Sequence, residues 1–163
     1  GISNGAAMSH RLACELGPTI RGIAPVSGSM PADLLKVCEP AAAVSVLTMN
    51  GTADELAKYE GGEVPSDRGL LASVDDVVAF WTDRNGCNMA PEIKQLPDRN
   101  TSDDSHVEAS SYRSCESGKS VTLYKIIGGG HTWPNANYYP GFLGPINRDV
   151  DASQAILTFF RLK

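Results

Sequence analysis

The sequence predicts an α/β fold in which a mostly parallel sheet is flanked by helices. Two apolar runs of strand length, residues 21–26 and 43–49, end in Ser-Gly and Asn-Gly. Their side chains do not alternate between apolar and polar, which is typical of parallel strands buried on both faces. Helical patterns alternate with these runs, as in an α/β sheet. The 163 residues are enough for one hydrophobic core, so we expect a single domain.

Three helices are predicted from apolar spacing and from the residues at their ends. The first covers residues 4–16, begins directly after Ser3 and stops at Gly-Pro. Its expected apolar face carries Ala7, Met8, Leu12 and Cys14. The second is capped by Ser73 and ends at the following Asn-Gly. The last has Asp149 or Asp151 as its cap and closes the chain with an apolar stripe.

Two neighbouring strands are expected in the second half of the chain. Residues 106–113 and 120–127 are separated by a cluster of turn-forming residues. The polar stretch 91–105 is predicted to be a loop. A second loop, rich in Pro, Gly and aromatic residues, is predicted at 132–145 and leads into the last helix.

Composition excludes several classes of partner. With 14 basic and 19 acidic residues the net charge is −5, which disfavours nucleic acid. The longest nearly apolar run, residues 41–49, is far shorter than the roughly 20 residues of a membrane helix, so no membrane partner is expected. The oligomeric state stays open. The chain begins abruptly at Gly1 without a leader, so we expect the gene product to begin further upstream.

The four cysteines predict disulfides rather than a metal site. They form no Cys-x-x-Cys pair and have no histidine at metal-ligand spacing. Cys87 and Cys115 lie in turn-rich surroundings and are expected to pair, which leaves Cys14 for Cys38. Alternatively, Cys14 is a small buried apolar residue of the first helix. Two disulfides would indicate a secreted or periplasmic protein.

Residues 1–5 match the pattern Gly-x-Ser-x-Gly of a nucleophile elbow. A nucleophilic Ser3 would occupy a strained turn between a strand and a helix, where glycines on either side relieve crowding. The N–H of Asn4, at the start of the helix, could then donate to an oxyanion. A glycine-rich turn without catalytic meaning explains the pattern equally well.

Asp54 and His131 complete a possible triad, because each follows a predicted buried strand. His131 is reached through three glycines, which let a loop bend without side-chain clashes. The order Ser, Asp, His is that of α/β-hydrolases. His10 and His106 are expected to be structural or surface histidines. Asp54 could instead be a turn residue, and other acids compete for its role: Asp33, Asp75, Asp76, Asp98, Asp103, Asp104, Asp149 and Asp151.

Several aromatic residues follow His131. Trp133, Tyr138 and Tyr139 could form a substrate-binding platform, or they could simply pack within their loop.

Taken together, these motifs resemble the secreted polyhydroxybutyrate depolymerase and feruloyl esterase family. The resemblance covers nearly the whole chain, and its most specific block is Gly-Gly-His-Thr-Trp-Pro at residues 129–134. It implies an α/β-hydrolase fold and a serine esterase with Ser3 as nucleophile, His131 as base and Asp54 as acid. It also implies polymeric or aryl ester substrates, of the polyhydroxyalkanoate, feruloyl or acetyl polysaccharide type, and chemistry without a metal or organic cofactor.

The sequence departs from this family in two places. The segment from Asp54 to Tyr59 lacks the usual proline. In addition, members carry a long stretch before the elbow that holds the first half of the sheet and a second oxyanion donor. We therefore expect residues 1–163 to be the C-terminal part of a single catalytic domain, impaired when isolated. Two alternative functions stay open: a polymer- or carbohydrate-binding module without catalysis, and a peptidase of the same fold.

Overall fold

The computed structural model describes residues 1–87 and 90–161, which form a mixed α/β structure. Its α-helices are α1 (Asn4–Glu15), α2 (Ala32–Val37), α3 (Val74–Arg84) and α4 (Ala152–Arg161). Its strands are β1 (Gly22–Ile23), β2 (Ser45–Gly51), β3 (Gly62–Glu63), β4 (Leu70–Leu71), β5 (Glu92–Gln95), β6 (His106–Tyr112) and β7 (Val121–Ile127). Short 3₁₀ turns occur at Gly17–Thr19, Glu116–Gly118 and Gly141–Leu143.

The central sheet has five strands in the order β1-β2-β7-β6-β5. β1, β2 and β7 are parallel, whereas β6 and β5 continue the sheet in antiparallel fashion. Beyond β1, Ile2 forms a parallel bridge to Val26, which itself bridges to Met49 of β2. A separate two-stranded hairpin is formed by β3 and β4. The predicted α/β class is therefore confirmed, as is the pairing of the two strands in the second half of the chain.

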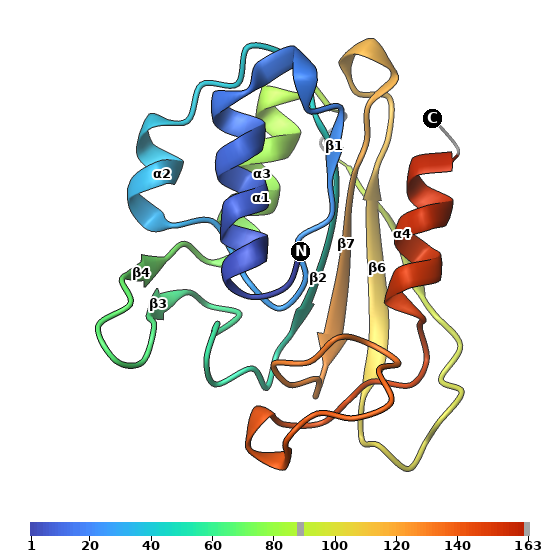
Figure 1. Ribbon diagram of the computed structural model, residues 1–163. Coiled ribbons are helices and arrows are strands. Elements are labelled where there is room, and N and C mark those ends of the chain that lie inside the picture. Colours follow the sequence, from blue (N-terminus) through green and yellow to red (C-terminus); the bar gives the residue numbers. More distant parts are fainter. Residues whose placement is uncertain (88–89, 162–163) are drawn as a thin grey trace.

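Helices cover both faces of the sheet. α1 and α3 lie on one face and α4 on the other (Figure 1). All seven residues of β2 are buried, which explains the continuous apolar run in its sequence. Val46 belongs to the core beneath α1 and α3, whereas Leu47 and Met49 belong to the core beneath α4. None of the helices within 1–87 and 90–161 is long and apolar enough to cross a membrane.

The first helix occupies its predicted position, but the predicted apolar face is wrong at Met8 and Leu12, whereas Cys14 does pack against the core. Met8 and Leu12 are exposed, while α1 buries Ala6, His10 and Ala13. Nδ1 of His10 accepts a hydrogen bond of 3.1 Å from Nε1 of Trp81 in α3. Small side chains let α1 approach its neighbours closely, and the fully buried histidine satisfies the indole N–H.

Two segments differ from their predictions. The stretch expected to be loop at 91–105 contains β5, an edge strand whose four residues are all exposed. The predicted strand at 21–26 is reduced to β1 and the bridge at Val26, because Pro25 has no N–H to donate to a neighbouring strand. No element was predicted for α2 or for the β3–β4 hairpin.

Side-chain hydrogen bonds identify the residues that cap the N-termini of α3 and α4. Oγ of Ser73 accepts the N–H of Asp76 at 3.0 Å, as predicted for α3. Asp151, and not Asp149, caps the last helix, since its Oδ1 accepts the N–H of Gln154 at 2.8 Å. The Asp149 carboxylate instead accepts the N–H groups of Arg99 and Asn100 in a neighbouring loop.

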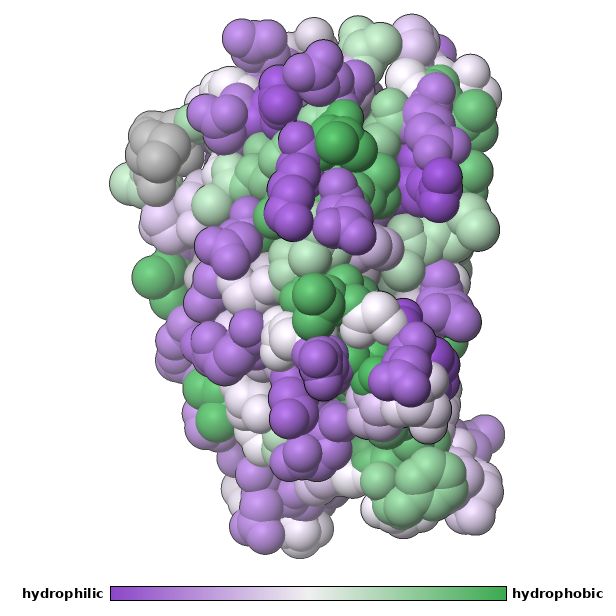
Figure 2. Space-filling view, turned by 90° about the vertical axis from the view of Figure 1, so that its left-hand side faces the viewer, coloured by the Kyte–Doolittle hydropathy of each residue, from purple (hydrophilic) through white to green (hydrophobic). Residues whose placement is uncertain are grey.

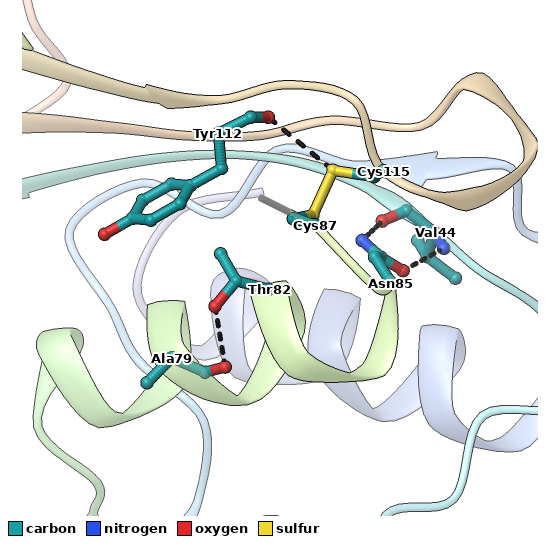
Figure 3. Close-up of a disulfide and its surroundings, with 7 residues drawn as sticks. All are labelled: Val44, Ala79, Thr82, Asn85, Cys87, Tyr112 and Cys115. Carbon is teal, nitrogen blue, oxygen red and sulfur yellow. Dashed lines mark hydrogen bonds between the residues drawn. A yellow bond between two sulfur atoms is a disulfide. The ribbon is translucent and has the colours of Figure 1, made fainter. Parts of the chain in front are cut away.

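Two disulfides are present, as predicted. Cys14 pairs with Cys38 and links the ends of α1 and α2, so the alternative of an unpaired Cys14 is wrong. Cys87 pairs with Cys115 and links the segment after α3 to the β6–β7 turn (Figure 3). Beside this second disulfide, the buried Asn85 side chain bonds both the N–H and the carbonyl of Val44.

Candidate active site

The carboxyl ends of the parallel strands bring the predicted site residues to one edge of the sheet. The N–H of Ser3 donates to Val26 at 3.0 Å. The loop after β2, which carries Asp54, is joined to the loop after β7, which carries His131, by a bond of 2.9 Å from the Ala53 N–H to Gly129. This edge is where open α/β sheets bind their ligands.

Asp54 and His131 form a buried pair. Nδ1 of His131 lies 2.8 Å from Oδ2 of Asp54, and the two residues are 6% and 3% exposed. The other carboxylate oxygen accepts the N–H groups of Leu56 and Ala57 at 2.9 and 2.8 Å, which fixes its orientation. Because a carboxylate oxygen can only accept, Nδ1 carries the proton in this contact. In this tautomer Nε2 is the ring nitrogen that can accept a proton.

Ser3 has a backbone conformation that residues other than glycine rarely adopt. Its φ is 55° and its ψ is −120°, immediately before the first turn of α1. Among the described residues nothing hydrogen-bonds to its hydroxyl, and the N–H of Asn4 at the start of α1 is also unpaired. A partly exposed hydroxyl therefore lies beside a free backbone donor and the positive end of a helix dipole.

The two glycines around Ser3 differ in importance. A Cβ at Gly1 would lie 2.7 Å from the Gly5 carbonyl oxygen, so a larger residue at Gly1 would collide with the backbone. A Cβ at Gly5 would meet nothing within 4 Å. The expectation that both glycines relieve crowding is thus correct for Gly1 and wrong for Gly5, since α1 leads Gly5 away from the strand.

The turn at Ser27 and Gly28 connects the surroundings of Ser3 with those of His131. A Cβ at Gly28 would lie 2.8 Å from the Ser3 carbonyl oxygen, so this backbone packs directly against Ser3. Ser27 donates a buried hydrogen bond of 2.7 Å to the carbonyl of Thr132, the residue after His131. Asn50 in turn donates to the Gly28 carbonyl at 3.0 Å. Sequence reasoning missed this link, because a Ser-Gly pair after an apolar run indicates only a turn.

The glycines before His131 serve mainly to allow close approach. Gly128 has a φ of 77°, which favours glycine. A Cβ at Gly130 would collide with the carbonyl oxygen of Leu143, and one at Gly51 would collide with that of Gly129. The prediction that these glycines let the loop bend is therefore confirmed at Gly128. Gly130 and Gly51 have a further role, because they allow loop backbones to approach each other closely.

A pocket of about 200 Å³ opens beside Ser3. It is lined by Ser3, Asn4 and Ala7 and by residues of the β3–β4 hairpin that include Leu70. The pocket is also lined by Ser29, which is 3% exposed and whose hydroxyl has no partner among the described residues. The sequence did not identify Ser29 as a site residue, because nothing in its sequence context indicates that its hydroxyl is buried.

The aromatic residues after His131 lie away from this pocket. Trp133 packs against the core beneath α4, and its Nε1 donates to Oγ of Ser153 at 3.2 Å. Tyr138 is 78% exposed and Tyr139 is partly exposed. None of the three lines the Ser3 pocket, so packing accounts for Trp133, while a substrate role for this group stays a prediction.

The remaining histidines and acids have other positions. His10 is buried in the core and His106 is exposed at the start of β6, as expected for structural and surface histidines. Asp103, like Asp149, accepts backbone N–H groups of surrounding loops. Within 1–87 and 90–161, no group of three or more His, Cys, Asp or Glu side chains is arranged to hold a metal ion.

Comparison with known proteins finds similarity to two proteins named as esterases. The chain is 28% identical over 136 residues to feruloyl esterase B of Piromyces equi, a match that covers 80% of this chain and 24% of that protein. It is 27% identical over 174 residues to NocK of Nocardia uniformis subsp. tsuyamanensis, provisionally named an esterase, covering 98% of this chain and 49% of that protein. The chain therefore spans half or less of each of these relatives. No family model matches the chain.

Proposed function

We propose that this protein is a serine esterase that hydrolyses carboxylic esters through an acyl-enzyme, with Ser3, Asp54 and His131 as its catalytic triad. The observation that carries the proposal is the buried contact of 2.8 Å between His131 and Asp54, which leaves Nε2 of the imidazole available as a base. The strained backbone of Ser3 before α1 supports a nucleophile elbow of the α/β-hydrolase type. The names of the two relatives support the same class of reaction.

In the proposed mechanism, the Ser3 hydroxyl attacks the ester carbonyl carbon and passes its proton to Nε2 of His131. Asp54 orients the imidazole and stabilises its charged form, and the N–H of Asn4 donates to the oxyanion. The proton then moves from His131 to the departing alcohol. Water, activated by the same imidazole, attacks the acyl-enzyme, releases the acid and regenerates Ser3.

The proposed substrates are polymeric or aryl esters, such as polyhydroxyalkanoates and feruloylated or acetylated polysaccharides. The similarity to a protein named feruloyl esterase B supports the feruloyl esters among these substrates. The two disulfides support a secreted or periplasmic location, because such bonds persist in oxidising compartments.

Turnover of p-nitrophenyl acetate and labelling by a fluorophosphonate probe test the proposal together. Replacing Ser3 with Ala should abolish both, because only an activated serine reacts with the probe. Ser9→Ala is the matched control, since Ser9 lies in α1, the helix that Ser3 precedes, and its hydroxyl donates to the Gly5 carbonyl. Undiminished turnover by Ser3→Ala contradicts the proposal. Cleavage of a peptide panel without any ester turnover would instead indicate a peptidase.

A further inference from the structure

A second hollow adjoins the Ser3 pocket and runs between α1 and α2. This α1–α2 groove has a volume of about 660 Å³, and its lining includes Met8, Arg11 and Glu15 of α1 and Leu34 and Val37 of α2. Asn4, Ala7, Pro31 and Asp33 line both the groove and the Ser3 pocket. The groove and the Ser3 pocket therefore adjoin each other at these four residues.

The groove exposes large apolar side chains. Met8 is 53% exposed on α1 and Val37 is 73% exposed on α2. Ala7 and Leu34 also line the groove and are partly buried. Green apolar surface interrupts the hydrophilic residues on the face of the molecule that includes α2 (Figure 2). Apolar side chains that gather in a hollow, rather than singly, mark a binding surface.

The charged residues of the groove are paired with opposite charges. Nε of Arg11 lies 2.8 Å from Oε1 of Glu15, and Nζ of Lys36 lies 3.3 Å from Oδ1 of Asp33. Each pair contains one positive and one negative side chain, so the pairs add no net charge at the border of the groove. The lining thus favours an uncharged, apolar ligand over an anionic or cationic one.

We propose that the α1–α2 groove holds an extended apolar chain of the ester whose carbonyl is attacked by Ser3. This inference rests on the proposed function and narrows its substrates to esters with a flexible chain of several carbon atoms. At a rise of 1.5 Å per residue, Asn4 and Arg11 are about 10 Å apart along α1. An acetyl group ends beside Asn4, whereas a longer chain reaches the exposed surface of Met8 and Val37.

Two series of esters test the inference and identify which part of the ester lies in the groove. One series lengthens the acyl chain of p-nitrophenyl esters from two to ten carbons, and the other lengthens the alcohol of acetate esters. For the part that enters the groove, kcat/KM should rise about two- to threefold per methylene, because the chain is buried on one side only. The double variant Met8→Gln/Val37→Thr should flatten this dependence. Leu157→Gln is the control, since Leu157 is 50% exposed on α4 and should leave the slope unchanged.

A binding experiment separates this inference from the proposed function. In Ser3→Ala protein with ¹³C-labelled methionine methyl groups, ethyl octanoate should shift the Met8 resonance. Met30 and Met49 are fully buried in the two cores and serve as internal controls that should not shift. Flat ester series together with an unshifted Met8 overturn the inference, even if acetate is hydrolysed and Ser3 is labelled. A shifted Met8 in a protein whose Ser3 is inert supports the groove and contradicts the esterase proposal.

Discussion

Nδ1 of His131 lies 2.8 Å from Oδ2 of Asp54, while Oδ1 of the same carboxylate accepts the N–H groups of Leu56 and Ala57. The two oxygens thus have separate tasks: Oδ1 holds the loop after β2, and Oδ2 holds the imidazole. A substitution that keeps an oxygen at Oδ1 but changes the group at Oδ2 should therefore preserve the structure of this loop and alter only the contact with the imidazole.

Asp54→Asn is that substitution. The amide oxygen still accepts the N–H groups of Leu56 and Ala57, so we expect a melting temperature close to that of the native protein. The amide nitrogen, however, would face Nδ1 of His131 and favour the tautomer with a protonated Nε2, which cannot accept a proton from Ser3. On this basis kcat for p-nitrophenyl acetate should fall about 10⁴-fold. An unchanged kcat would remove Asp54 from the proposed triad.

The contrast between Gly28 and Gly5 predicts opposite effects of the same substitution. In Gly28→Ala the new Cβ would lie 2.7 Å from Cβ of Ala6 and 2.8 Å from the Ser3 carbonyl oxygen, so the start of α1 must move. Since a displacement of about 1 Å can cost 10²-fold in rate, we expect a loss of that order in kcat/KM. Gly5→Ala has open space and should stabilise α1 by about 0.5 to 1 kcal/mol. Equal kcat/KM values for the two variants would contradict this account of the Ser3 backbone.

His10 predicts a specific dependence of stability on pH. Complete burial lowers the pKa of His10 from 6.5 to about 3. Above pH 6.5 the ring is neutral in both folded and unfolded chains. Between pH 6.5 and 3 the unfolded chain binds a proton that the folded chain does not. The free energy of unfolding should therefore fall with decreasing pH, by up to about 1.4 kcal/mol per pH unit from this residue.

Urea unfolding at pH 7 and pH 4.5 measures this contribution. His10→Gln can still offer an acceptor to Trp81 but cannot titrate, so its stability should fall less than that of the native protein over this interval. His106→Gln is the control, because His106 is exposed and its removal should not alter the difference between the two pH values. Identical pH dependence in the native protein and His10→Gln would contradict the prediction.

Asn85 is expected to be important for stability although it lies away from the candidate site. Its side chain is fully buried and bonds the backbone of Val44 at 2.9 and 2.7 Å, beside the Cys87–Cys115 disulfide (Figure 3). Asn85→Ala leaves a buried N–H and a buried carbonyl without partners, so the free energy of unfolding should fall by about 2 to 4 kcal/mol. Asn137→Ala, at an exposed loop position, should change it by less than about 0.5 kcal/mol. A similar effect of both variants would contradict the proposed role.

The fold could be predicted where burial and local chemistry agree. The strand β2 was predicted from its continuous apolar run. The helix α3 was predicted from its cap at Ser73. β5 was missed because Glu92–Gln95 are entirely exposed, so the strand depends on pairing with β6 rather than on an apolar pattern. The buried face of α1 was mispredicted because helix packing there selects Ala6, His10 and Ala13 over the larger apolar residues.

The candidate site could be predicted in part because parallel strands place their carboxyl ends at one edge of the sheet. That rule brings together Asp54 and His131, which are 77 residues apart. The contact between Ser27 and Thr132 and the burial of the Ser29 hydroxyl could not be predicted. Both depend on how the loops fold back over the edge, and serines at such positions have no distinctive spacing.

Both disulfides lie away from the candidate site. Cys115 precedes β7 whereas His131 follows it, and Cys14 lies in the last turn of α1 whereas Ser3 precedes the first turn (Figure 1). At the site end, contacts such as that from Ser27 to Thr132 are hydrogen bonds, so a local opening motion breaks no covalent bond there. Amide protons in the loop at 132–145 should consequently exchange with solvent sooner than those around Cys115, where opening requires the cross-linked core to separate. The covalent bonds thus restrict local opening chiefly at the end of the sheet that lies away from the candidate site.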